Sequence, residues 1–126
     1  MDITIDDIPP TIGDSHLIRQ VYINLLSNAM KFTKTIQYPK ITIGYSSSEK
    51  LGGYYVKDNG IGFEDQFAEK IFDVFYKLDK SGTYEGTGVG LAIVKRIIIK
   101  HNGLIQAHSK LGSGAAFYFT LEKKVS

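Results

Sequence analysis

The chain has 126 residues, of which 43% are hydrophobic and 22% are charged, as is ordinary for one globular domain. Its 15 basic and 13 acidic residues leave a net charge of +2, too small to indicate nucleic acid or membrane as a partner. The absence of cysteine excludes disulfides and thiolate metal sites. With neither a signal-peptide pattern nor an apolar stretch near the roughly 20 residues of a membrane span, we expect a cytoplasmic domain without direct membrane contact.

The N-terminal third predicts a short strand followed by a long amphipathic helix. Residues 1–6 alternate between apolar and polar side chains, and the prolines at 9 and 10 end that pattern. Asp14 or Ser15 can cap a helix by accepting hydrogen bonds from its free first-turn amides. From there to about Phe32, apolar residues recur at i, i+3, i+4 and i+7, which indicates one buried face.

The middle of the chain predicts a hairpin, a partly helical segment and a loop. Residues 40–46 and a strand that begins at Tyr54 flank a glycine turn, which indicates an antiparallel pair leading into Asp58. Residues 64–76 are in part helical, with phenylalanines on the apolar side. Residues 77–85 carry too few apolar side chains to pack on a core, so we expect a mobile loop.

The C-terminal third predicts a second long helix and two further strands. Residues 88–101 are apolar on most sides, and Asn102 and Gly103 predict the end of the helix, with Gly103 able to take a positive φ. Residues 104–110 and 115–122 are typical of strands joined by a glycine-containing turn. The order of elements predicts an α+β two-layer sandwich, with helices on one face of a mixed, largely antiparallel sheet.

Three polar residues of the first predicted helix form a candidate metal and phosphate site. Asn24, Asn28 and Lys31 fall within about 60° of one another on a helical wheel, at the border of the apolar face. Carboxamide oxygens suit Mg²⁺, which takes oxygen ligands and commonly shares its shell with substrate phosphates. Lys31 would neutralise a phosphate. For the helix alone, a solvated polar face is the simpler interpretation.

A carboxylate followed by two glycines forms a candidate site for a base. Asp58 ends a predicted strand, and Gly60 and Gly62 let the chain bend and approach a ligand without Cβ atoms. A carboxylate there could accept a hydrogen bond from an exocyclic amine, such as that of adenine. The sequence Asp-Asn-Gly is also common in ordinary turns, so the motif alone does not establish a site.

A second glycine cluster, at residues 86–90, precedes the second predicted helix. Free amides and the positive end of the dipole at a helix N-terminus favour phosphate. The cluster is not a dinucleotide fingerprint, because Leu91 stands where a third glycine or alanine is needed and no strand precedes it. The chain also lacks the P-loop sequence. Both familiar glycine-loop interpretations therefore fail.

In this order and spacing, the three clusters resemble the N, G1 and G2 boxes of the catalytic ATP-binding domain of sensor histidine kinases. The sequence Phe-Asp-Val-Phe-Tyr at 72–76 resembles their F box. The resemblance covers about residues 14–121. It implies the Bergerat-type sandwich of gyrase, heat-shock chaperone and mismatch-repair ATPases, with residues 1–126 as a single catalytic domain.

The resemblance also implies which residues hold Mg²⁺ and the phosphates of ATP. Asn28, helped by Asn24, takes the Mg²⁺ position. Lys31 and Lys77 take phosphate-contacting positions. Residues 77–85 match the ATP lid, whose ordering on nucleotide binding is the expected gating motion.

For the rest of the nucleotide, the resemblance assigns roles to the two glycine clusters. Asp58 takes the position that binds the adenine amine, Gly60 and Gly62 shape the floor beneath the base, and Leu91 lies near the base. The phosphates are contacted by Thr87, Gly88 and Gly90.

Sensor kinases phosphorylate a histidine within a His-Glu motif on a helical dimerisation domain, and the chain departs from that pattern. His16, His101 and His108 are not followed by glutamate, are expected to be isolated from one another and from acidic partners, and are interpreted as surface or helix-end histidines. We therefore expect a catalytic domain that binds ATP and Mg²⁺ without phosphorylating itself. Its implied partners are the histidine-bearing dimerisation domain of a parent kinase and a downstream response regulator.

Two other functions use the same fold. One is a hydrolytic ATPase, in which a glutamate four residues before the metal-binding asparagine activates water. That position is Asn24 here, which cannot act as a general base and so favours a kinase. The other is an anti-sigma-like serine kinase that holds ATP and a protein partner, which the F box fits less well.

Overall fold

The computed structural model describes residues 2–5, 14–47, 52–73 and 90–121. Its five strands form one sheet in the order β1-β2-β3-β5-β4, in which β1 runs parallel to β2 and the other pairs are antiparallel. In chain order the elements are β1 (Asp2–Ile5), α1 (Ser15–Phe32), β2 (Lys40–Ser46), β3 (Gly53–Asp58), the 3₁₀ turns η1 (Asp65–Phe67) and η2 (Lys70–Phe72), α2 (Gly90–Lys100), β4 (Ile105–Lys110) and β5 (Gly114–Phe119).

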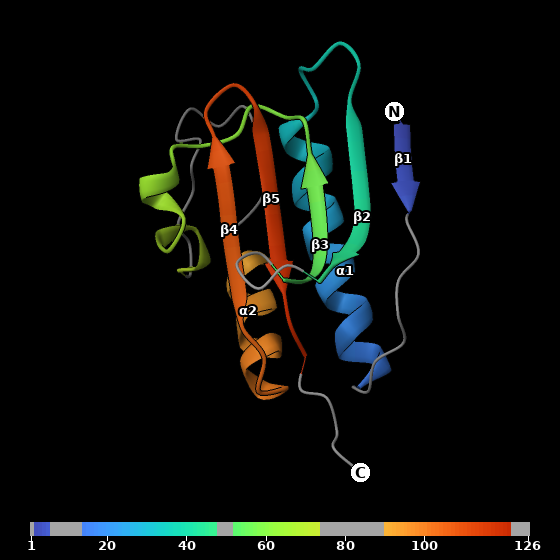
Figure 1. Cartoon of the computed structure of the whole chain (residues 1–126), viewed down its shortest axis with the longest axis vertical. Coiled ribbons are helices and arrows are strands. Elements are labelled where there is room, and N and C mark those ends of the chain that lie inside the picture. The colour runs from blue at the N-terminus through green and yellow to red at the C-terminus, as the bar shows by residue number, and fades with distance from the viewer. Residues whose placement is uncertain (1, 6–13, 48–51, 74–89, 122–126) are drawn as a thin grey trace.

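Both α-helices lie on the same face of the sheet (Figure 1). The predicted α+β two-layer sandwich is therefore confirmed. None of the helices within the described ranges is long and apolar enough to cross a bilayer.

The core fills the space between the sheet and the helices. On α1 the buried residues recur every four positions, at Val21, Leu25 and Ala29, as the sequence pattern predicts. Strand residues at alternate positions meet them from the sheet, and Phe117 and Phe119 of β5 are the largest fully buried side chains. The sheet is thus buried on its helical side by apolar side chains that the period-two pattern places there.

Asp14, rather than Ser15, caps α1. Its Oδ1 atom accepts hydrogen bonds from the backbone amides of His16, at 2.9 Å, and Leu17, at 3.1 Å. The hydrogen bond from the Leu17 amide is the main reason why the pKa of the Asp14 carboxyl lies below its ordinary value. The Asp14 amide donates to Nε2 of His101, at 3.1 Å, and His101 Nδ1 lies 2.9 Å from the Ile97 carbonyl oxygen. His101 is a helix-end histidine as predicted, but it is not isolated from an acidic residue.

The segment 64–76 is helical in part, as predicted, since its described residues form two 3₁₀ turns. One local prediction was wrong. At the end of α2 the positive φ, of 58°, belongs to Asn102 and not to Gly103. Gly103 is needed for a different reason, since a Cβ atom there would collide with the Thr120 carbonyl oxygen. The start that was predicted for α2 at residue 88 lies outside the described residues.

A first prediction concerns the packing of α1 on the sheet. Leu25 has 0% exposure, so Leu25→Ala should lower the free energy of unfolding by about 2–5 kcal/mol, through lost burial and the cavity left behind. Ile23 lies on the same helix with 57% exposure, and Ile23→Ala should change it by no more than about 0.5 kcal/mol. Urea unfolding of both variants measures the difference. Equal losses would contradict the assigned face of α1.

Candidate nucleotide-binding site

The polar residues of α1 lie where the wheel places them. Asn24, Asn28 and Lys31 are all half-buried, at the edge of the apolar face rather than opposite it. Asn24 Nδ2 donates to the Gln20 carbonyl at 3.0 Å, which orients the carboxamide and leaves its Oδ1 for another partner. The helix thus presents two carboxamides and an ammonium group along one side.

The first residue of α2 approaches the polar side of α1 closely. A Cβ atom on Gly90 would lie 3.3 Å from Asn24 Oδ1, so these two residues are neighbours although 66 positions separate them in the chain. Gly90, the first described residue of α2, therefore lies beside Asn24. Leu91, the next residue, is half-buried and packs against the core.

Asp58 is a buried acid at the end of β3. Its side chain is only 6% exposed, and Oδ1 accepts a hydrogen bond from the Gly60 amide at 2.8 Å. Burial raises the pKa of the carboxyl, and the backbone amides of Gly60 and Ala115 counteract part of that effect. A carboxylate can accept about four hydrogen bonds, so capacity remains for a ligand amine.

The segment after Asp58 is held between α1 and the β4–β5 turn. The Ile61 amide donates to the Phe32 carbonyl at 3.0 Å, and the Ile61 carbonyl accepts from the Gly112 amide at 2.7 Å. A Cβ atom on Gly60 would collide with the Phe32 carbonyl oxygen. Gly62, at φ +65°, would collide in the same way with the main chain of the turn. Both predicted glycines are therefore required by the main chain itself.

Two residues that the sequence analysis did not select hold this segment. Ser109 Oγ accepts from the Phe63 amide at 2.7 Å and donates to the Gly114 carbonyl at 2.8 Å. Asn59 Oδ1 accepts from the Lys40 amide at 2.8 Å, and its Nδ2 donates to the Tyr38 carbonyl at 2.9 Å. One signal could have revealed Ser109: it is a hydroxyl in the inward-facing series of β4, where the strand pattern calls for an apolar side chain.

The side-chain oxygens of Asn24 and Asn28 could coordinate Mg²⁺ only together with phosphate oxygens of a bound nucleotide. Within the described ranges there is no group of three or more His, Cys, Asp or Glu side chains that could hold a metal ion. Asn24 and Asn28 offer neutral oxygens, and the Asn28 side chain forms no hydrogen bond with a described residue. Neutral ligands suit a cation that already faces polyphosphate charge.

Some predicted site residues cannot be placed. Lys77, Thr87 and Gly88 lie outside the described residues, as does the predicted lid at 77–85. Of the F-box sequence, Phe72 and Asp73 are described. Phe72 is buried, and its ring meets Phe117 edge-on at 6.2 Å, so the start of this motif packs into the core.

A buried acid and a glycine bend follow β3 beside the C-terminal end of α1, and Asn24 on the polar side of that helix adjoins Gly90. A family model described as histidine kinase-, DNA gyrase B- and HSP90-like ATPase matches residues 13–125. The chain belongs to this family of ATP-binding domains, as the resemblance implied.

Individual relatives point to one branch of the family. Cyanobacterial phytochrome A of Nostoc sp. is 43% identical over 120 residues, which are 95% of this chain and 16% of that protein. Sensor histidine kinase WalK of Bacillus subtilis is 41% identical over 113 residues, 88% of this chain and 18% of WalK. Full-length ShkA, solved in complex with AMPPNP, is 27% identical with a TM-score of 0.76, over 98% of this chain and 26% of ShkA. The chain thus spans less than a fifth of these two sequence relatives.

The second prediction tests the role of Ser109. Ser109→Ala removes the acceptor of the Phe63 amide and should lower the free energy of unfolding by about 1–3 kcal/mol, because that amide is left without a partner. Ser113, in the adjoining turn, is exposed, and Ser113→Ala should have little effect. Urea unfolding compares the two variants. If Ser113→Ala costs as much as Ser109→Ala, the hydroxyl of Ser109 does not hold this segment.

Proposed function

We propose that the chain binds ATP with Mg²⁺ and transfers the γ-phosphoryl group to a histidine on a separate dimerisation domain, in two-component signal transduction. The observation that carries the proposal is the convergence on α1: Gly60 adjoins its C-terminal end, and Gly90 adjoins Asn24 two turns earlier. Gly60 and Gly90 therefore both adjoin α1. The AMPPNP bound to ShkA, an ATP analogue, supports the choice of ligand.

The adenine end of the ligand is assigned to Asp58. Its carboxylate already accepts from the Gly60 amide and has further lone pairs for the exocyclic amine. Gly60 and Gly62 form the floor beneath the base, and Leu91 lies near it. Burial makes Asp58 selective for a ligand that carries an amine. A ligand without one would leave the carboxylate with an unmade hydrogen bond that water cannot replace.

The phosphate end is assigned to the polar side of α1 and to the segment that leads into α2. Asn28 and Asn24 would hold Mg²⁺ together with the phosphate oxygens, and Lys31 would contact a phosphate. Bound Mg²⁺ would neutralise charge that develops on the phosphoryl oxygens. The remaining proposed contacts come from Lys77, Thr87, Gly88 and Gly90, and the lid at 77–85 would close over the nucleotide.

The chain's contribution to the transfer would be to position and neutralise the reacting groups. A nitrogen of the acceptor imidazole would attack the γ-phosphorus in line, a nitrogen–phosphorus bond would form, and the bond to the bridging oxygen would break to release ADP. The acceptor comes from elsewhere, because none of the three histidines in the chain is followed by glutamate.

A hydrolytic role is disfavoured by the residue four positions before Asn28. Water activation there needs a general base, and the Asn24 carboxamide cannot take up a proton near neutral pH. Its Nδ2 is also committed to the Gln20 carbonyl. We therefore propose slow ATP turnover, with the dimerisation domain of the parent kinase as the natural acceptor and a response regulator downstream. The domain itself would act in the cytoplasm, with no nucleic acid or direct membrane contact.

The third prediction tests the adenine assignment. Asp58→Asn keeps one oxygen for the Gly60 amide but presents Nδ2 to the ligand amine, so that two donors face each other. Binding of a fluorescent ATP analogue should weaken about 10- to 100-fold, as expected for the loss of a hydrogen bond to a charged group. Glu64→Gln, which neutralises an exposed acid nearby, is the matched control. Equal affinity of Asp58→Asn and wild type would refute the assignment.

The fourth prediction follows from the raised pKa of Asp58. Because the folded chain holds this proton more tightly than the unfolded chain, with its ordinary value of 3.8, the resulting stabilisation is complete below that pH. It is lost as the pH rises through the raised pKa of the folded state. The stability of the wild type relative to Asp58→Asn should therefore fall with rising pH in this window, whereas analogue binding should rise. Urea unfolding and analogue titration across acidic pH measure both. Parallel pH profiles of the two proteins would contradict it.

The fifth prediction concerns phosphoryl transfer. Incubated alone with γ-labelled ATP, the chain should acquire no stable label. Addition of a purified dimerisation domain with a His-Glu motif should place label on that domain, and Asn28→Ala should reduce it to background because the proposed Mg²⁺ ligand is lost. Ser27→Ala, an exposed neighbour on α1, is the control. Stable label on the isolated chain, or brisk hydrolysis that Asn24→Ala abolishes, would overturn the proposed activity.

A further inference from the structure

The sheet has a second face that neither α-helix covers, here called the open face (Figure 1). Val56, Phe117 and Ala107 align across β3, β5 and β4 and belong to the core. Side chains alternate between the two faces of a strand, so the residues that follow or precede them point the other way. The row next to them on the open face is Lys57, Ala116 and His108.

Aromatic rings form the neighbouring row. The rings of Tyr55 and Tyr118 lie 5.5 Å apart, and His108 meets Tyr118 edge-on at 6.1 Å. A Cβ atom on Gly44 would lie 2.6 Å from Tyr55 Cζ, which shows that this ring lies across β2 instead of standing away from the sheet. The open face is thus a flat, half-buried aromatic surface with little conformational freedom left to lose on binding.

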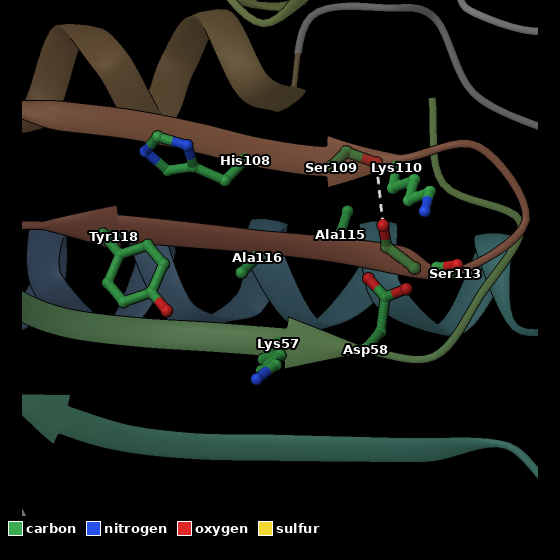
Figure 2. A pocket seen from close by; sticks show the side chains of 10 residues that line it. Lys57, Asp58, His108, Ser109, Lys110, Ser113, Ala115, Ala116 and Tyr118 are labelled. Atoms are coloured by element: carbon green, nitrogen blue, oxygen red, sulfur yellow. Dashed lines mark hydrogen bonds between the residues drawn. The ribbon is translucent and has the colours of Figure 1, made fainter. Parts of the chain in front are cut away.

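A hollow of about 240 Å³ adjoins these rings towards the β4–β5 turn. Figure 2 shows Tyr118, His108, Lys57 and Lys110 around it, with Ala116 on the middle strand, β5. Pockets for drug-sized ligands usually enclose about 300–1,000 Å³. The hollow is smaller than that and suits a side chain of a partner that lies along the surface.

The exposed charged side chains that line the hollow have one sign. Lys57 and Lys110 are exposed, and neither forms an ion pair with any residue in the described part of the chain. Lys40 is exposed at the start of β2, in the series that shares the open face with Lys57. Asp58 also borders the hollow, but it is 6% exposed and its Oδ1 is bonded to the Gly60 amide. The accessible charges at the hollow are therefore basic.

We propose that the open face docks an acidic polypeptide segment of a partner protein. Carboxylates of that segment would pair with Lys57 and Lys110, and an intervening apolar side chain would enter the hollow beside Tyr118. Charge complementarity of this kind steers association and fixes the register of the bound segment. Lys57, Lys110 and Tyr118 are not among the residues assigned to the nucleotide, although Asp58 borders both sites, and docking does not depend on the proposed kinase activity.

Nucleic acid is the less suitable occupant. Single strands bind through ring faces that are free to stack on bases along a continuous basic groove. Here Tyr118 is flanked by the rings of Tyr55 and His108, and the whole chain has a net charge of only +2. The two interpretations can be separated by experiment.

The test uses the whole 126-residue chain and a fluorescein-labelled peptide of repeated Glu-Glu-Leu units, without nucleotide. Anisotropy at low salt should show binding, and the double variant Lys57→Glu/Lys110→Glu should bind about tenfold more weakly or worse. The control Arg19→Glu/Arg96→Glu places the same two charge reversals on exposed helix positions and should bind as the wild type does. Titration with an ATP analogue and thermal unfolding of both variants establish that the fold is retained.

Three results would overturn the proposal. The first is no binding of the acidic peptide to the wild type, and the second is an equal loss in both double variants, which would indicate net charge alone. The third is tighter binding of labelled oligothymidylate than of the peptide, with loss in the Lys57→Glu/Lys110→Glu variant, which would favour nucleic acid. Failure of analogue binding with peptide binding intact would count only against the proposed ATP site.

Discussion

The candidate site depends on the main-chain hydrogen bonds that hold the segment after β3 on both sides. Ile61 donates to the Phe32 carbonyl at the end of α1 and accepts from Gly112 in the β4–β5 turn. Backbone groups that leave water need such partners, so this segment has few alternative positions. Gly60 and Gly62 are consequences of this arrangement, because any Cβ atom would collide with one of the two flanking elements. The position of Asp58 is thereby fixed before any ligand arrives.

A buried acid beside this segment works against folding. Burial removes the Asp58 carboxyl from water and so disfavours its charged form. The pKa of this carboxyl is raised for that reason. The Gly60 amide offsets part of this cost at 2.8 Å, yet an uncharged side chain of similar shape would be easier to bury. Proteins retain such local conflicts mainly where function needs them. Asp58 is therefore the residue whose presence is hardest to explain by stability alone.

The sequence predicted what depends on local patterns. The buried face of α1, its end at Phe32 and the limits of β2 follow from side-chain periodicity, and the structure confirms them. Ser109 was missed because its partners lie 46 and 5 residues away, and only the folded sheet brings the more distant one to it. Residues 64–76 were predicted to be helical in part, and their described residues form two short 3₁₀ turns, with Phe72 packed edge-on against Phe117.

The rigidity of α1 gives Gly60 and Gly90 a fixed separation. Gly90 adjoins Asn24 and Gly60 adjoins Phe32, eight residues further along the same helix, which at 1.5 Å per residue is about 12 Å. One residue inserted between these two positions would lengthen that distance and rotate the far end by about 100°. Loops around the domain can change length in evolution, but the number of residues between Asn24 and Phe32 should stay constant. This stretch of α1 should therefore tolerate substitutions of single side chains better than it tolerates insertions or deletions.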